Sequence, residues 1–254
     1  MKTTITNHLK SLYENNSDRI NLFTFDELQN KIIPLNNNQI AITKLLTTDY
    51  NKIHVIPEII ISANESTNAK IESPQFIVEK YFDQYYTSVI LNIKSELTES
   101  VANIIYKVLQ NVPIHLIIKS EIKDELQLFE EKAIGISTHF INLSSLKVPI
   151  LQRYADICSK LNISLIVNCI SIKEIEIAIN SGIKAISLSS TDMISKKENI
   201  LNTMNLRKHI PNKIVTFCEY GIRTLHNLKQ LNEVGFDAAI VSVEIADHLD
   251  VSIY

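Results

Sequence analysis

The stretch SLIVNCISIKEIEIAINSGIKAISLS, residues 164–189, contains the pattern that decides the fold. Two short runs rich in Ile, Val and Leu, Ser164–Cys169 and Lys184–Ser189, flank a segment with the apolar spacing of a helix. Strand–helix–strand units of this kind typically surround a parallel sheet, whose strands are apolar because both faces of the sheet are buried. The stretch therefore predicts one unit of a β/α fold.

The same alternation extends along most of the chain. It predicts eight strands whose starts lie about 20 to 34 residues apart, as the units of a closed barrel require. The predicted strands are His54–Ile61, Thr87–Ile93, Ile114–Lys119, His139–Leu143, Ser164–Cys169, Lys184–Ser189, Lys213–Cys218 and Ala238–Val243. An open doubly wound sheet would give the same alternation, but no G-x-G-x-x-G motif or P-loop favours it. We predict an α/β fold, the (β/α)8 or TIM barrel.

The remaining segments complete this prediction. SPQFIVEKYFDQY, residues 73–85, opens with a Ser-Pro helix start, and TLHNLKQLNEVG, residues 224–235, ends on a glycine that stops a helix. The residues after the last predicted strand leave room for only about two helical turns. We therefore predict a single domain over residues 1–254, with a helical extension in 1–50, the barrel in 51–254 and a short or missing last helix.

Composition excludes several classes of function. The chain has 21% charged residues and a net charge of −3, so it lacks the basic field that attracts nucleic acid. We expect a cytosolic protein, because no apolar run is long enough for a signal peptide or a membrane span. The three cysteines are far apart, and the seven histidines show no metal-ligand spacing, so we expect neither disulfide nor metal nor cofactor.

Polar residues recur at the carboxyl ends of the predicted strands, where barrel enzymes bind their ligands. These residues are Glu58, Asn92, Lys94, Lys119, Asn142, Asn168, Ser189, Glu219 and Ser242. A glutamate inside the apolar run VIPEIII is costly if it is unpaired, so we expect Glu58 to contact Lys119 across the barrel mouth. Such a pair would serve either catalysis or the structure.

The segments that carry these residues resemble, in order and spacing, the signatures of indole-3-glycerol phosphate synthases. Those signatures run AEIKRASPSKG, LRKDF, LVEVH, INNRDL, SESGI and VGESLM. The matching segments here are VIPEIIISANEST, LIIKSE, LIVNCISIKEIEIAINSGIKAISLSSTDM, FCEYGIRT and DAAIVSVEIA. The register holds over about residues 22 to 246, and the spacing between segments supports the resemblance more than any single match.

Four positions of the family pattern are retained. The resemblance implies that Glu58 helps hold the substrate, that Lys119 is the general acid of ring closure and that Glu219 lines the substrate pocket. It also implies that the backbone of Gly221 lies near the substrate phosphate. The implied activity is that of a decarboxylating carbon–carbon lyase of tryptophan biosynthesis, which acts on a small phosphorylated substrate without a cofactor.

More positions of the pattern are replaced than retained. The replacements are Ile60 for the first-strand lysine, Asn168 for the fifth-strand glutamate, Ser189 and Thr191 for the asparagine and arginine of INNRDL, Tyr220 for a serine, Ser242 followed by Val243 for the glycine of VGES, and the loop SANEST for ASPSKG. An asparagine keeps the shape of a carboxylate base but cannot accept its proton. Asn168, Ser189 and Ser242 remain candidates for binding the substrate or its phosphate, and Tyr220 is either a lid over a closed pocket or a catalytic phenol.

Three functions therefore compete. The first is a catalytically impaired member or pseudoenzyme that acts through a protein partner, the second is an active synthase, and the third is a barrel enzyme for a related sugar phosphate. Outside the mouth, we expect core or capping roles for His115 and His139 at strand starts on the stabilising face of the barrel. We interpret the charged run EIKDELQLFEEK as a solvated helix face.

Overall fold

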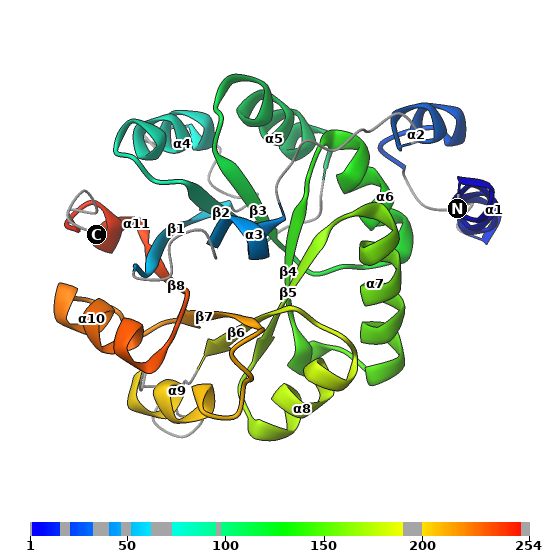
Figure 1. Ribbon diagram of the computed structural model, residues 1–254. Coiled ribbons are helices and arrows are strands. Elements are labelled where there is room, and N and C mark those ends of the chain that lie inside the picture. The colour runs from blue at the N-terminus through cyan, green and yellow to red at the C-terminus, as the bar shows by residue number, and fades with distance from the viewer. Residues whose placement is uncertain are drawn as a thin grey trace.

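The computed structural model describes residues 2–15, 21–32, 41–46, 52–61, 73–94, 98–189 and 200–249. In these ranges the chain forms a closed barrel of eight parallel strands, each paired with its neighbours in the sequence, and β1 pairs with β8 to close it (Figure 1). The strands are β1 His54–Ile61, β2 Ser88–Ile93, β3 His115–Lys119, β4 Thr138–Asn142, β5 Ser164–Cys169, β6 Ala185–Ser189, β7 Val215–Glu219 and β8 Ala238–Ser242. The predicted eight-stranded β/α barrel is confirmed.

Each predicted strand overlaps an observed one, and the differences lie at the ends. β1 and β5 have the predicted bounds, whereas β7 begins two residues later than predicted. It begins later because a turn in which the Ile214 N–H donates to the Pro211 carbonyl precedes the strand. Strand ends depend on such local hydrogen bonds, which apolar runs do not encode.

Helices follow the strands and form the outer layer of the barrel (Figure 1). They are α4 Pro74–Asp83, α5 Glu99–Asn111, α6 Glu125–Ile134, α7 Val148–Leu161, α8 Ile172–Asn180, α9 Ile200–Arg207, α10 Leu225–Val234 and α11 Val243–Ala246, with a 3-10 turn, η1, at Leu143–Ser145. The predicted start of α4 and the predicted end of α10 are confirmed. Ser73 caps α4 by accepting a hydrogen bond from the Phe76 N–H, and Gly235 ends α10 in the left-handed conformation. The last of these helices has only four residues, in agreement with the predicted short last helix.

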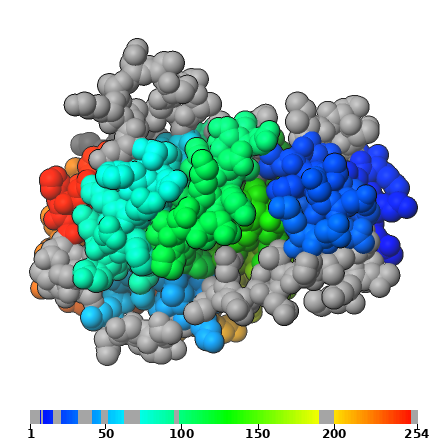
Figure 2. Space-filling view, turned by 90° about the horizontal axis from the view of Figure 1, so that it is seen from above, coloured from blue at the N-terminus to red at the C-terminus, as the bar shows by residue number. Residues whose placement is uncertain are grey.

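The described parts of the amino-terminal extension form the predicted helices, which lie in two different places on the barrel. α1 Lys2–Asn15 and α2 Phe25–Ile32 pack against α6 on the outside of the barrel, where the blue helices lie beside the green segment (Figure 2). α3 Ile42–Leu46 instead closes the amino-terminal end of the barrel, because Ile42 and Leu46 belong to its interior apolar cluster. The Ile42 N–H also donates to Ser164 Oγ at the start of β5, at 3.3 Å.

Alternate side chains of the strands fill the barrel and set the position of the mouth. The interior cluster includes Ile56, Ile90, Ile117, Phe140, Ile166, Phe217 and Ile240, one from each of seven strands. Side chains alternate between the two faces of a strand, so the residue two positions further on also points inward. For these seven strands that residue is polar: Glu58, Asn92, Lys119, Asn142, Asn168, Glu219 and Ser242. The mouth is therefore a polar ring directly above an apolar interior.

The prediction of a solvated helix face for the charged run EIKDELQLFEEK is wrong. α6 occupies most of this run, and Glu130, Glu131 and Lys132 on it are 1%, 0% and 3% exposed. α1 and α2 cover the outer side of α6, and the Leu22 N–H donates to Glu130 Oε1 at 2.8 Å. Charge composition could not predict this burial because the covering helices come from a distant part of the chain.

Candidate active site

Three charged side chains from β1, β3 and β7 meet at the centre of the barrel mouth. Lys119 Nζ lies 3.0 Å from Glu58 Oε1 and also donates to Glu219 Oε1. Glu58 Oε1 accepts a second hydrogen bond from Asn92 Nδ2 on β2, at 2.6 Å. The predicted contact between Glu58 and Lys119 is therefore present, and the three charged residues singled out in the sequence converge.

Burial and charge act against each other in this triad. Lys119 is 6% exposed and Glu219 is 1% exposed, and the Lys119 ammonium lies 4.6 Å from the centre of the Phe140 ring. Burial lowers the pKa of the Lys119 ammonium, but Glu219 and then Glu58 more than offset this effect, so that pKa lies above its ordinary value. Burial raises the pKa of the Glu219 carboxyl above its ordinary value, although Lys119 opposes the rise.

The β4 to β6 side of the mouth has hydrogen bonds in place of charges. Asn168 Nδ2 donates to Asn142 Oδ1 at 3.0 Å and to Ser189 Oγ at 2.9 Å. Asn168 and Ser189 are buried, whereas Asn142 is exposed at the end of β4. This side therefore contains amides and a hydroxyl, but no carboxylate at the position where the resemblance expects the base. Thr191 and the SANEST loop lie outside the described residues.

The other two residues predicted to bind the substrate or its phosphate, Gly221 and Ser242, lie at the ends of β7 and β8, outside the charged triad. Tyr220 and Gly221 both have a positive φ, 73° and 78°, and the half-exposed Tyr220 ring lies 5.8 Å from Lys119 Nζ. A Cβ at position 221 would lie 3.4 Å from Ile200 Cβ, an ordinary contact distance, so it is the positive φ that favours glycine here. Ser242 ends β8, is exposed and pairs in register with Glu58.

Two further residues complete the surroundings of the triad. Phe140 lies two residues before Asn142 on β4, and its ring lies beneath the Lys119 ammonium. It was not among the residues predicted from the sequence. Its inward position follows from the two-residue alternation of β4, which could have identified it. Ile60, at the position of the lost lysine, is 57% exposed at the rim and provides no charge there.

A cavity of about 290 Å³ opens beside Lys119, lined by Asn92, Ser120, Phe140 and Asn142 among others. Two larger cavities, of about 710 and 660 Å³, lie around α3 at the opposite end of the barrel, away from the charged triad. We assign the candidate site to the mouth because the convergent polar groups are there. Within the described ranges, no three His, Cys, Asp or Glu side chains are placed to hold a metal ion.

Of the two histidines expected on the stabilising face of the barrel, only His115 lies there, whereas His139 reaches the loop that follows Lys119. His115 is the first residue of β3, and its Nε2 lies 2.8 Å from Thr138 Oγ1. Burial lowers the pKa of His115 to about 4, so its imidazole is neutral at physiological pH. His139 is fully buried on β4 and pairs with Glu131 of α6.

The protein is an eight-stranded β/α barrel in which a lysine is held between two glutamates at the carboxyl ends of the strands, the end where barrel enzymes have their active sites. The chain belongs to the indole-3-glycerol phosphate synthase family, whose model matches residues 3–253. Among the described helices, none combines the length and the apolar character needed to cross a membrane.

Individual relatives carry the same family name. The indole-3-glycerol phosphate synthase of Chloroherpeton thalassium is 27% identical over 168 residues, which is 66% of this chain and 65% of the relative. That of Acetivibrio thermocellus is 25% identical over an equally long match, also 65% of its length. The chain thus spans just under two thirds of these two relatives. That of Lacticaseibacillus casei is 24% identical over 194 residues, 74% of this chain and 73% of the relative.

A solved structure with a similar fold is a thiamine phosphate pyrophosphorylase from Pyrococcus furiosus. It superposes with a TM-score of 0.56 and 12% identity, and the match covers 76% of this chain and 87% of that one. At this identity the likeness concerns the barrel fold alone.

Proposed function

We propose that this chain is a catalytically impaired member of the indole-3-glycerol phosphate synthase family that keeps a ligand-binding mouth. The observation that carries the proposal is the state of Asn168, which fills the position of the expected base. Its amide bonds to Asn142 and Ser189, and an amide cannot take up a proton at this point of a reaction.

The two carboxylates of the triad do not supply the missing base. Glu58 and Glu219 both contact the Lys119 ammonium, whereas Asn168 bonds to Asn142 and Ser189. The reaction implied by the family closes an indole ring with loss of carbon dioxide and then water, and it needs an acid and a base that act on different atoms. A general acid–base group typically contributes about 10²- to 10⁴-fold to a rate, so we expect turnover to be lower by at least about two orders of magnitude.

The proposed ligand is a small phosphorylated compound, as in the family. Gly221, which has a positive φ and no side chain of its own, supports a phosphate at the β7 end of the mouth. Ser242 adds a Cβ where the family has glycine, and its exposed side chain hydrogen-bonds to Glu244, a bond that a phosphate at this point would have to replace. Ile60 provides no charge for a ligand carboxylate at the rim.

An assay of ring closure tests the proposal. The purified protein is incubated with the carboxyphenylamino-deoxyribulose phosphate, and indole fluorescence is followed. We expect no turnover above that of Lys119→Ala. The variant Asn168→Glu/Ile60→Lys restores both missing charges and should turn over at least about tenfold faster than its matched uncharged control, Asn168→Gln/Ile60→Met.

The second candidate is an active synthase, and a specific observation favours it. Lys119, Glu58 and Glu219 are in contact, with Lys119 and Glu219 buried, and the relatives bear the name of the enzyme. Turnover by the unmodified chain that Lys119→Ala abolishes would establish this candidate and reject the proposed impairment. A thermal-shift titration with sugar phosphates is a separate measurement, because a bound ligand stabilises the folded state whether or not it reacts.

A further inference from the structure

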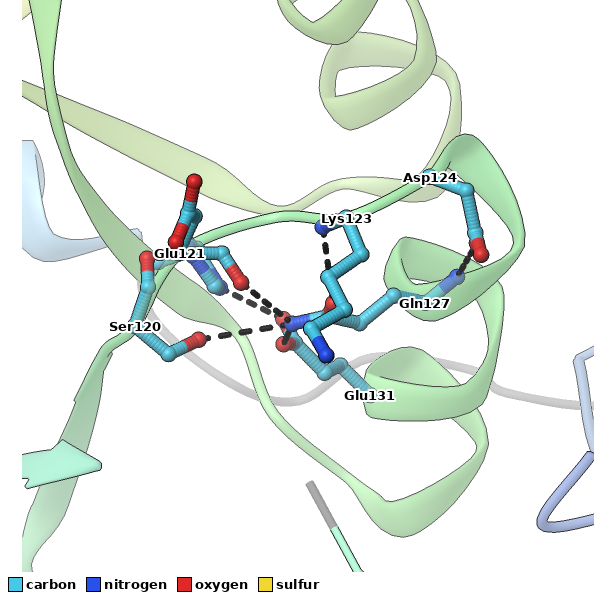
Figure 3. Close-up of polar contacts among 7 residues, drawn as sticks. Ser120, Glu121, Lys123, Asp124, Gln127 and Glu131 are labelled. Carbon is cyan, nitrogen blue, oxygen red and sulfur yellow. Dashed lines mark hydrogen bonds and ion pairs between the residues drawn. The ribbon is translucent and has the colours of Figure 1, made fainter. Parts of the chain in front are cut away.

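The loop that follows Lys119 is held by one glutamine of the neighbouring helix. Gln127 Nε2 lies 3.3 Å from Ser120 Oγ and 3.4 Å from the Glu121 carbonyl, and its Oε1 accepts from the Lys123 N–H at 3.2 Å. Gln127 Nε2 also donates to Glu131 Oε1 at 2.9 Å. Figure 3 shows Gln127 pointing from its helix into the turn formed by Ser120, Glu121 and Lys123. The loop is thus tied to α6 at three of its residues.

A buried acid–imidazole pair holds the same loop from β4. Glu131 and His139 are both 0% exposed, and His139 Nδ1 lies 2.6 Å from Glu131 Oε2. His139 Nε2 lies 3.3 Å from the Ser120 carbonyl oxygen. A carbonyl oxygen only accepts, so Nε2 carries a proton, and a second proton lies between Nδ1 and Oε2. The pair is therefore neutral as a whole, and both ring nitrogens are used.

These contacts replace backbone pairing that is sparse at this point of the barrel. β3 pairs with β4 at only three positions, Ile117 with Thr138, Ile118 with His139 and Lys119 with Phe140. β4 pairs with β5 at five positions. The sheet therefore ends at Lys119 itself, and the next residue is fixed by His139 and Gln127.

We propose that Gln127, Glu131 and His139 form a clamp that positions Lys119 for the barrel mouth by fixing the backbone of Ser120. The clamp is a positioning device, since none of its three side chains contacts Glu58 or Glu219 in the described structure. Its role is independent of turnover, because it concerns where the Lys119 ammonium lies. A buried ion pair can often be replaced by apolar residues without loss of stability, so packing alone gives no reason for this one.

The chemical state of Lys119 reports on the clamp. The pKa of the Lys119 ammonium lies above its ordinary value only while the carboxylates of Glu219 and Glu58 remain in contact with it. If the loop is released, the ammonium moves away from them and its pKa falls. A fall of one unit makes the reactive, unprotonated fraction about tenfold larger.

The test measures the rate at which an acylating amine reagent modifies Lys119 in the folded full-length chain, by peptide mass spectrometry across a pH series. The variant Glu131→Leu/His139→Phe removes the pair without leaving one charge buried alone. We expect its Lys119 to react about tenfold faster at a given pH, with the midpoint of the pH profile lowered by about one unit. Gln127→Met, which keeps the shape of the side chain, should change the rate in the same direction and serves if the double variant does not fold.

Two controls make the outcome decisive. Glu131→Gln keeps the His139 bond to Ser120 and should leave the profile of Lys119 unchanged. His115→Leu/Thr138→Val removes a buried histidine contact between the same two strands at their other end, and it should also leave the profile unchanged. The clamp is rejected if folded Glu131→Leu/His139→Phe or Gln127→Met shows the unmodified rate, or if the His115→Leu/Thr138→Val control shifts the profile equally. Absence of indole formation does not affect this readout, so failure of the clamp and failure of the proposed function are distinguished.

Discussion

Strand β3 has a basic side chain at each end, and the barrel treats the two in opposite ways. At the mouth, Lys119 contacts two carboxylates, and its pKa lies above the ordinary value. At the amino-terminal end, His115 contacts the hydroxyl of Thr138, and burial lowers its pKa to about 4. The two residues lie four positions apart on the same face of one strand, so the difference comes from what the adjacent strands place beside them.

The two ends of the barrel differ in whether they stabilise a buried charge. Burial disfavours the charged form at both ends, and only the mouth provides carboxylates that offset it. The amino-terminal end needs no charge, because α3 closes it with Ile42 and Leu46. Charge is also unevenly distributed within the mouth, since Asn168 on β5 and Ser189 on β6 are neutral side chains that hydrogen-bond to each other.

Removing the charge at the mouth should have the largest effect. Lys119→Met leaves Glu219 buried against Glu58 without a cation, and breaking a buried pair in this way typically costs about 3 to 5 kcal/mol. We expect a loss of that size in the free energy of unfolding, measured in urea at pH 7. The control Lys119→Met/Glu219→Leu removes the buried carboxylate as well and should recover most of the loss. A loss below about 1 kcal/mol in the single variant would show that the triad is solvated and not comparable to a buried pair.

At the amino-terminal end, the contribution of His115 to the stability of the chain should depend on pH. The folded pKa of His115, about 4, lies below the unfolded value, so the neutral ring contributes stability that is fully present above about pH 6.5 and is lost as pH falls toward 4. The stability difference between the unmodified chain and His115→Gln should fall by about 2 kcal/mol between pH 7 and pH 4, after allowance for partial exposure of the ring. Thermal unfolding at a series of pH values measures it. A difference that stays constant over this range would mean that His115 titrates in the folded state as it does in the unfolded chain.

The sequence predicted these two ends unequally. The strand-end rule placed Glu58, Lys119 and Glu219 at the mouth, because a two-residue alternation and parallel strands leave little freedom there. The sequence also predicted the contact between Glu58 and Lys119, but not the bond of Lys119 to Glu219 or that of Asn92 to Glu58. It missed Phe140 as well, since such partners come from other strands whose register is set by the whole barrel. The burial of α6 was predicted wrongly for the same reason: the helices that cover it are about 100 residues away, as the bond from Leu22 to Glu130 shows.

Weakening the triad without breaking it should give a smaller effect. In Glu219→Gln, burial acts on the Lys119 ammonium with only Glu58 to oppose it, so the pKa of Lys119 should fall. A pKa that is raised in the folded state stabilises the chain fully at pH values below the unfolded pKa, and this stabilisation is lost as pH rises through the folded pKa. The free energy of unfolding of the unmodified chain should therefore exceed that of the variant by about 1 kcal/mol less at pH 11 than at pH 8. Urea unfolding at each pH gives the difference. An advantage that is independent of pH would assign the role of Glu219 to packing.

A new cation at the exposed rim of the mouth should change stability least, because it tests an added charge that is near the triad but not buried. Ile60 is 57% exposed and lies two residues after Glu58 on the same strand, so Ile60→Lys would place an ammonium near the triad but in water. An exposed ion pair contributes little, and surface substitutions usually change stability by less than about 0.5 kcal/mol, so we expect no larger change relative to Ile60→Met at pH 7. The pH profile of Lys119 modification should also stay in place, because solvent screens the added charge. If Ile60→Lys instead lowered the pKa of Lys119 by a full unit, the distance to nearby charges and not burial would determine that pKa. The difference between Lys119 and His115 would then have to be explained by nearby charges alone.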